Sequence, residues 1–161
     1  MGKMPSIGVN GQYISESLAI IDYQERLQPS PSMVPADPFA AAKAVELACH
    51  IKLNVELVAR RCLPEALFNT PVSDETKAST EKDLDRGMKA VGQLMVCNPY
   101  AAGDTFSIAD LYTYYSFGLA STIGQKMFNK DILADYPQIA GLMEHLAERP
   151  SIKRVTLEAS S

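Results

Sequence analysis

The apolar and polar positions at the start of the chain predict a β-hairpin. The dipeptide Asn10-Gly11 separates two short runs of strand-forming residues, and a tight primed turn needs positive φ at both central residues, which Asn and Gly tolerate. The strand formers are Val9 before the turn and Tyr13 and Ile14 after it. We therefore expect two antiparallel strands joined by a two-residue turn.

A helix is expected directly after the hairpin. Leu18, Ile21 and Leu27 recur at helical intervals, so they can share one apolar face. Ser15 offers an N-cap, and Glu16 falls in the first turn, where the helix dipole favours negative charge. The first backbone N–H groups of a helix lack internal partners, so this helix start is a candidate site for a carboxylate.

A proline-rich segment follows and marks a domain boundary. Residues 28–38 hold four prolines and little apolar content, which is typical of an extended linker. We therefore divide the chain into a small unit over residues 1–28, a linker over residues 29–37 and a second domain over residues 38–161.

The second domain begins with a long helix from Pro38 to near Arg61. Asp37 is a good N-cap, and Pro38 suits the first helical position. A polar stripe of Lys52, Glu56 and Arg60 interrupts the apolar pattern. It is either an ion-pair ladder on an exposed edge or part of a helix beside an active-site cleft or a dimer interface. Two apolar ridges line the helix: Val45, Cys49, Leu53 and Leu57, and then Leu47, Ile51, Val55 and Val58.

A second long helix is expected from Ser73, which caps it, to Asn98-Pro99, which ends it. Acidic residues occupy its first turn, where they complement the helix dipole. Its buried line is expected to comprise Leu84, Met88, Val91 and Met95.

The third long helix carries a capping box. Ser107 is followed three residues later by Asp110, and Phe106 and Leu111 occupy the positions of a hydrophobic staple. This box is a structural signal rather than a chemical one. An aromatic cluster follows on the helix, most of it expected in the core, with one or two members lining a pocket: Tyr112, Tyr114, Tyr115 and Phe117.

Composition narrows the class of protein. The chain has 161 residues, 47% hydrophobic and 21% charged, which is typical of a globular protein. A net charge of −4 and the lack of any basic run argue against nucleic-acid binding. No run of eighteen apolar residues and no signal peptide are present, so we expect no membrane association and a cytoplasmic location.

The cysteines and histidines indicate neither a disulfide framework nor a metal site. Cys49, Cys62 and Cys97 are odd in number and form no C-x-x-C pair, so reduced thiols are expected. Glu46 and His50 share a helix face, but a third ligand is lacking. We therefore expect no metal.

Six motifs together resemble the glutathione S-transferase family, of the bacterial type, over nearly the whole chain. Lys3-Met4-Pro5, the Asn10-Gly11 hairpin and Glu16-Ser17 resemble the second half of its thioredoxin-like domain. The remaining motifs resemble its helical C-terminal domain: Val34-Pro35-Ala36-Asp37-Pro38, the Ser107–Asp110 capping box with the Gly-Asp before it, and the segment from Asp135-Tyr136-Pro137 to Arg149-Pro150-Ser151-Ile152.

The resemblance implies a fold that is mostly α-helical. It comprises an all-helical glutathione-transferase C-terminal bundle, preceded by a partial thioredoxin-like unit of one hairpin and one helix. It also implies a function, the conjugation of the thiol of glutathione to small hydrophobic electrophiles.

Five residues are the glutathione-binding set that the resemblance implies. Lys3 would reach the glycyl carboxylate, and a cis bond before Pro5 would turn the backbone of Met4 toward the cysteinyl backbone. Ser17 would bind the γ-glutamyl carboxylate, and Glu16 would accept from the α-ammonium group. Glutathione is thus expected as co-substrate.

The resemblance leaves the catalytic residue unknown. The Tyr, Ser or Cys that activates the thiol in this family lies upstream of the matching segment, and a lone hairpin leaves an open strand edge. We therefore expect either that Met1 is internal to a longer natural protein or that a partner covers the edge.

The resemblance also leaves two alternative functions open and implies a homodimer. The first alternative to the transferase is a non-catalytic glutathione-transferase-like interaction module. The second, less favoured alternative is a glutathione-dependent isomerase. A homodimer is expected through the first helix and the helix from Pro38 to Arg61.

Overall fold

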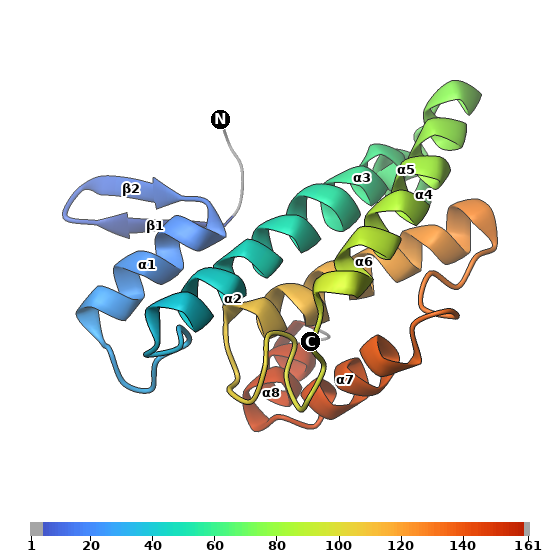
Figure 1. Cartoon of the computed structure of the whole chain (residues 1–161). Coiled ribbons are helices and arrows are strands. Elements are labelled where there is room, and N and C mark those ends of the chain that lie inside the picture. Colours follow the sequence, from blue (N-terminus) through green and yellow to red (C-terminus); the bar gives the residue numbers. More distant parts are fainter. Residues whose placement is uncertain (1–4, 160–161) are drawn as a thin grey trace. The chain divides into compact units, whose positions relative to one another are not determined.

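The computed structural model describes residues 5–159 of the chain. They form two compact units, divided between Val34 and Pro35, within the segment predicted as a linker. The fold is mostly helical, with one small hairpin at its start, as predicted (Figure 1). In the described part of the chain, no helix is long and apolar enough to cross a membrane.

The first unit is a hairpin followed by one helix. Strand β1 (Ser6–Val9) pairs antiparallel with β2 (Gln12–Ser15), and Val9 lies opposite Gln12 at the turn. Asn10 and Gly11 connect the strands with φ of 48° and 78°, the positive values that a primed turn requires. The predicted hairpin is therefore confirmed.

Helix α1 (Ser17–Leu27) completes the unit, but its start differs from the prediction. Ser15 stays in β2, paired with Ser6, so it does not cap the helix. Glu16 is the N-cap residue instead, and no side chain caps α1 within residues 5–159. Glu16 therefore precedes the first turn rather than lying in it.

The predicted apolar face of α1 is also shifted. Ile20 is the buried residue, at 7% exposure, whereas Leu27 is 66% exposed. Six residues of α-helix rotate the chain by about 600°, so Leu27 points about 120° away from Ile21. Leu27 therefore does not belong to the buried face that was predicted for this helix.

The second unit is a bundle of helices. Helix α2 (Pro38–Ile51) continues through a π-helical turn (Lys52–Glu56), α3 (Leu57–Ala59) and a 3-10 turn (Arg60–Cys62) into α4 (Leu63–Phe68). The remaining elements are α5 (Asp74–Leu94), α6 (Ile108–Phe128), α7 (Pro137–Ala147) and α8 (Pro150–Ala159).

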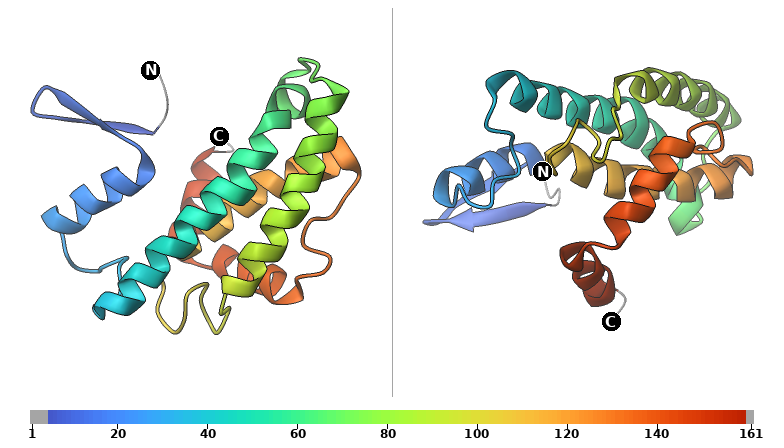
Figure 2. Two further views of the ribbon diagram at one scale, coloured as in Figure 1. Left: turned by 45° about the horizontal axis from the view of Figure 1, so that its top comes forward. Right: turned by 60° about the horizontal axis from the view of Figure 1, so that its bottom comes forward.

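Helix α6 forms the centre of this bundle. It packs against α2, the π-helical turn, α4, α5 and α7, as the two views of Figure 2 show. Phe117 and Ile123 on α6 are fully buried. Other fully or almost fully buried side chains come from α2, the π-helical turn and α5: Leu47, Ile51 and Val55, and Leu84, Met88 and Val91.

The two apolar ridges predicted on the first long helix have different environments. Leu47, Ile51, Val55 and Val58 are at most 7% exposed, as a core ridge should be. Val45, Leu53 and Leu57 are 38%, 58% and 43% exposed, so the other ridge lies on the surface. The ridges start two residues apart, which is about 200° around a helix. One packing layer therefore cannot bury both.

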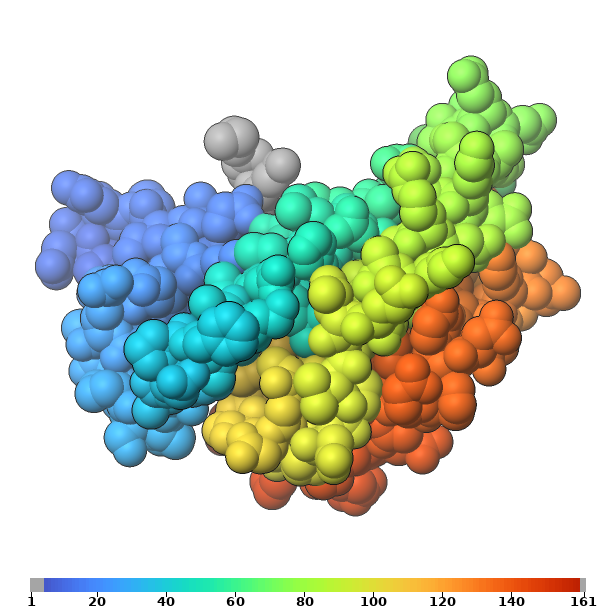
Figure 3. All heavy atoms as spheres, viewed as in Figure 1, coloured from blue at the N-terminus to red at the C-terminus, as the bar shows by residue number. Residues whose placement is uncertain are grey.

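Helix α5 crosses the π-helical turn at a glycine. A Cβ atom added to Gly87 would lie 2.0 Å from the carbonyl oxygen of Asn54. The two backbones thus approach more closely than any side chain permits. On the face drawn in Figure 3, α2 and α5 lie side by side. Helix α5 ends at Leu94, four residues before the predicted end at Asn98, because Met95 adopts an extended conformation.

The capping box at the start of α6 is present and buried. The Asp110 carboxylate accepts from the N–H of Ser107 at 2.8 Å, and the Ser107 hydroxyl accepts from the N–H of Ala109 at 3.3 Å. Asp110 also accepts from the N–H of Ala101 at 2.8 Å, so it joins the preceding loop to the helix. Burial raises the pKa of the Asp110 carboxyl, against the opposing effect of these hydrogen bonds.

Candidate functional site

At the N-terminal end of α1, the first backbone N–H groups have no backbone acceptor in the described part of the chain. The first backbone hydrogen bond of the helix runs from the N–H of Ile20 to the carbonyl of Glu16 at 3.0 Å. The N–H groups of Ser17, Leu18 and Ala19 accordingly have no backbone acceptor within residues 5–159. Ser17 is half-buried. Such a helix end attracts anions, because its N–H groups and the helix dipole both favour negative charge.

Glu16 has an uncommon backbone conformation at this end. Its φ is 75° and its ψ is 123°, a combination that a residue with a Cβ atom rarely adopts. This single residue turns the chain from β2 into α1. Strained residues of this kind concentrate at ligand-binding sites, where the surrounding structure maintains them.

The hairpin register brings two parts of the predicted site together. Ser6 pairs with Ser15, so Pro5 and Glu16, the next residues outward, lie at the same end of the hairpin. Pro5 is exposed, Glu16 is exposed and Ser17 follows it directly. Lys3 and Met4 lie outside the described residues, as does the geometry of the bond between Met4 and Pro5.

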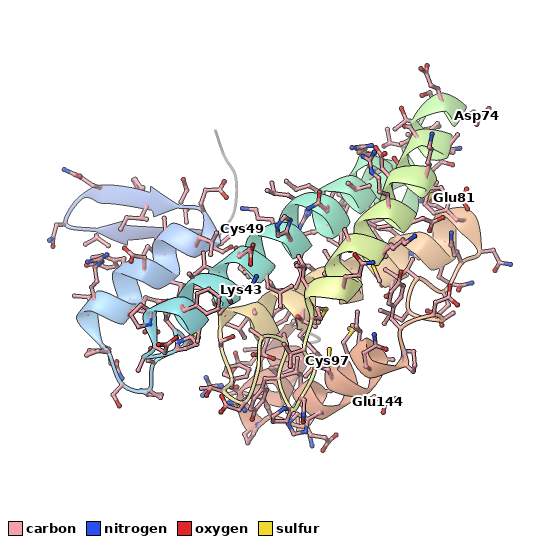
Figure 4. All side chains as sticks on the ribbon, viewed as in Figure 1. Lys43, Cys49, Asp74, Glu81, Cys97 and Glu144 are labelled. Atoms are coloured by element: carbon pink, nitrogen blue, oxygen red, sulfur yellow. The ribbon has the colours of Figure 1, made fainter. Side chains whose placement is uncertain are left out.

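The three cysteine thiols are free. Cys49 lies on α2 and Cys97 lies in the segment between α5 and α6 (Figure 4). Both are half-buried, whereas Cys62 is buried. Burial and the nearby Asp110 raise the pKa of the Cys97 thiol, which disfavours the reactive thiolate. Among residues 5–159, no group of three His, Cys, Asp or Glu side chains is placed to hold a metal ion.

The aromatic cluster of α6 divides between core and surface. Phe117 is fully buried and Tyr112 is 8% exposed. Tyr115 is 47% exposed and makes an edge-to-face contact with Tyr114, with ring centroids 5.2 Å apart. Burial and Tyr114 raise the pKa of the Tyr115 hydroxyl, so it stays protonated at neutral pH. Tyr115 is thus the most exposed of these four side chains.

A small pocket lies between α2 and the segment that follows α5. Its rim includes Lys43 and Glu46, which form an ion pair with each other. The other lining residues are apolar: Leu47, Leu94, Val96 and Ala102. Because its two charges satisfy each other, the pocket presents no unmatched polar group to a ligand.

Sequence reasoning missed one polar contact between helices. The Ser116 hydroxyl of α6 donates to the Glu56 carboxylate at 2.6 Å, and Arg60 donates to the same carboxylate from its Nε at 2.8 Å. The Lys52, Glu56 and Arg60 stripe was the available signal. The pairing with Ser116, sixty residues away, depends on the packing of α6 and could not be inferred from helix periodicity.

Comparisons with known proteins agree with this architecture. Residues 64–155 match the family model of the glutathione S-transferase C-terminal domain. A glutathione S-transferase of Pseudomonas putida is 36% identical over 154 residues, which cover 96% of this chain and 70% of that protein. A probable maleylacetoacetate isomerase of Drosophila melanogaster is 28% identical over 155 residues, 92% of this chain and 57% of that protein.

The fold recurs in solved structures. A glutathione transferase homologue from Sulfitobacter, solved with bound glutathione, superimposes with a TM-score of 0.79 at 20% identity, over 97% of this chain and 82% of that one. At such identity the likeness concerns the fold. Together with the bacterial relative and the matched domain, it shows that the chain belongs to the glutathione S-transferase family.

Proposed function

We propose that the first unit binds glutathione and that the protein conjugates its thiol to small hydrophobic electrophiles. The observation that carries this proposal is the start of α1. There, a strained Glu16 and a half-buried Ser17 lie beside three backbone N–H groups that have no backbone acceptor among residues 5–159, in a chain of the glutathione S-transferase family.

Each binding residue has a role that suits its chemistry. The N–H and hydroxyl of Ser17 bind the γ-glutamyl carboxylate at the positive end of the helix. Glu16 accepts from the α-ammonium group. Met4, turned by Pro5, pairs with the peptide backbone as an added strand would, and Lys3 acts as a point charge for the glycyl carboxylate.

Thiol activation is the step to which no described residue is assigned. A free thiol has a pKa of about 8.5 and is only slightly ionised at neutral pH. Conjugation therefore needs a hydrogen-bond donor at the sulfur. Tyr13 and Ser15 carry hydroxyls near the site but lie exposed on β2, and we give them no such role.

We also propose a homodimer and a cytoplasmic location. Each unit by itself exposes large apolar side chains. Leu27 on α1 is 66% exposed, and Phe39 and Val45 on α2 are 75% and 38% exposed. A second copy of the chain would remove this apolar area from water. The three cysteines are free, which suits a reducing compartment.

A glutathione-dependent isomerase is the second candidate, favoured by the isomerase name of the Drosophila relative. The two activities differ in the fate of glutathione, since a transferase consumes it and an isomerase returns it. A non-catalytic interaction module would show no turnover with either type of substrate.

Calorimetric titration of the chain with millimolar glutathione tests the binding site. We expect saturable binding that weakens roughly tenfold in Ser17→Ala, the effect of losing one hydrogen bond to a charged group. Ser151→Ala is the matched control, because Ser151 is an exposed serine in the first turn of α8. Equal affinity in the wild type and Ser17→Ala would overturn the assignment of Ser17.

A further inference from the structure

The contact between Glu56 and Ser116 holds a carboxylate in a well-defined place. Ser116 is 2% exposed, and the side chain of Glu56 is 17% exposed. One carboxylate oxygen accepts from Ser116 and the other from Arg60. The hydrogen bond from the Ser116 hydroxyl to the Glu56 carboxylate is 2.6 Å long. Hydrogen bonds to a charged acceptor at this distance are stronger than those between neutral groups. Glu56 therefore does not belong to a purely exposed ion-pair ladder, because its carboxylate also bonds to a buried serine of α6.

The π-helical turn places Glu56 in this position. The N–H of Leu57 bonds to the carbonyl of Lys52, five residues back, so the turn holds one residue more than a regular turn. Such an insertion changes the directions, about the helix axis, of the side chains after the turn relative to the side chains before it. They occur frequently at functional sites, which makes the side chains just after the turn the first to consider.

Arg60, one turn after Glu56, is left with free donors. Its Nε is bonded to Glu56, and within residues 5–159 neither of its terminal nitrogens has a hydrogen-bond partner. The side chain is 44% exposed. By contrast, Arg26 uses both Nε and a terminal nitrogen on Asp22. Arg60 is thus an oriented guanidinium with open donors.

The surface beside Arg60 is apolar. Leu53 lies in the π-helical turn, and Leu57 and Arg60 follow it at intervals of about one turn each, so the three residues recur along the same stretch of helix. The two leucines are 58% and 43% exposed. A molecule that matches this stripe carries an apolar body and, at one end, an anion. The planar fork of a guanidinium best matches a carboxylate.

We propose that Arg60, oriented by Glu56 and Ser116, binds the carboxylate of an amphipathic co-substrate whose apolar part lies on Leu53 and Leu57. This inference rests on the proposed function and assigns it a substrate class, electrophiles that carry a carboxylate. Arg60 is the specificity-determining residue, and Glu56 and Ser116 are positioning residues.

Binding of cinnamate and of its neutral counterpart cinnamamide to the full chain tests the proposal. Cinnamate offers a carboxylate on an apolar body, and cinnamamide lacks the charge. We expect Arg60→Gln to weaken cinnamate binding roughly tenfold, as for loss of a charged hydrogen bond, and to leave cinnamamide unchanged. The matched control is Arg26→Gln, which removes an exposed arginine of the same i,i+4 geometry and should change neither.

Nuclear magnetic resonance separates positioning from fold stability. We expect cinnamate to shift the Nε–Hε resonance of Arg60. Ser116→Ala should move this resonance in the free protein, and Ser116→Thr, which keeps the hydroxyl, should restore it. Equal binding of cinnamate to the wild type and to Arg60→Gln would overturn the proposal. An Arg60 Nε–Hε resonance that does not shift when cinnamate is added would also overturn it.

A glutathione titration distinguishes the source of the carboxylate. If Arg60→Gln weakens binding of glutathione and not of cinnamate, the carboxylate belongs to glutathione and the assignment to the co-substrate is wrong. If cinnamate binds through Arg60 while glutathione does not bind at all, the proposed function fails and carboxylate recognition stands. If glutathione binds and cinnamate does not, this inference alone fails.

Discussion

The two units of the chain differ in how they are stabilised. Among residues 5–34, Ile20 is the one side chain that is less than a tenth exposed, whereas the second unit buries side chains from all of its long helices. A two-stranded hairpin is marginally stable by itself. Yet the small unit has the strained Glu16 and the unpaired N–H groups of α1. The proposed glutathione-binding residues thus lie in the unit with the smaller core.

The largest expected effect tests the claim that close packing fixes the second unit. Gly87→Ala would place a Cβ atom 2.0 Å from the Asn54 carbonyl oxygen, which forces α5 away from the π-helical turn. We expect a loss of about 3 kcal/mol in the free energy of unfolding, measured by urea denaturation.

Gly118→Ala on α6 is the control for this change. A Cβ atom at Gly118 meets nothing within 4 Å, so alanine should stabilise the helix by up to about 1 kcal/mol. If both variants lose the same stability, the packing of α5 against the turn is not what holds this unit.

The next effect concerns the first unit and has opposite signs for stability and binding. Glu16→Gly relieves the strain at φ 75° and should stabilise the hairpin by about 1 kcal/mol, measured by hydrogen exchange in β1 and β2. It should also weaken glutathione binding, because the carboxylate is lost. Glu16→Ala separates the two, since it removes the carboxylate and keeps the strain. Stabilisation by alanine as well would contradict the strain argument.

The smallest effect is a pH dependence in the second unit. Hydrogen bonds from Lys77 and from the N–H of Val72 lower the pKa of Glu65 below its ordinary value of 4.5. A lowered pKa gives stability that is fully present above pH 4.5 and is lost as the pH falls through the folded-state pKa. We therefore expect Glu65→Gln to flatten the acid side of the stability profile of α4 and α5. An unchanged slope below pH 4.5 would contradict this.

The sequence predicted the elements whose signals are local. The Asn10-Gly11 turn, the Asp37 cap and the Ser107–Asp110 box each depend on residues a few positions apart, and all three are present. Such features are determined by backbone preference and short-range hydrogen bonds.

Features that depend on packing were not predictable. The positive φ of Glu16 has no signal in a residue type that rarely adopts it. The π-helical turn and the Glu56 to Ser116 bond need α6 in place. Periodicity also could not show which ridge of α2 faces the core, because both ridges are apolar. The proposed glutathione-binding set, Lys3, Met4, Pro5, Glu16 and Ser17, remains a prediction, and Lys3 and Met4 lie outside the described residues.

The approach of Asn54 to Gly87 restricts how two helices can move. A slide of α5 by one helical turn in either direction would replace Gly87 at this contact with Leu84 or Val91, each of which has a Cβ atom. The close approach therefore allows one register of α5 on the π-helical turn. Any rearrangement of the bundle that leaves the contact intact must keep this register.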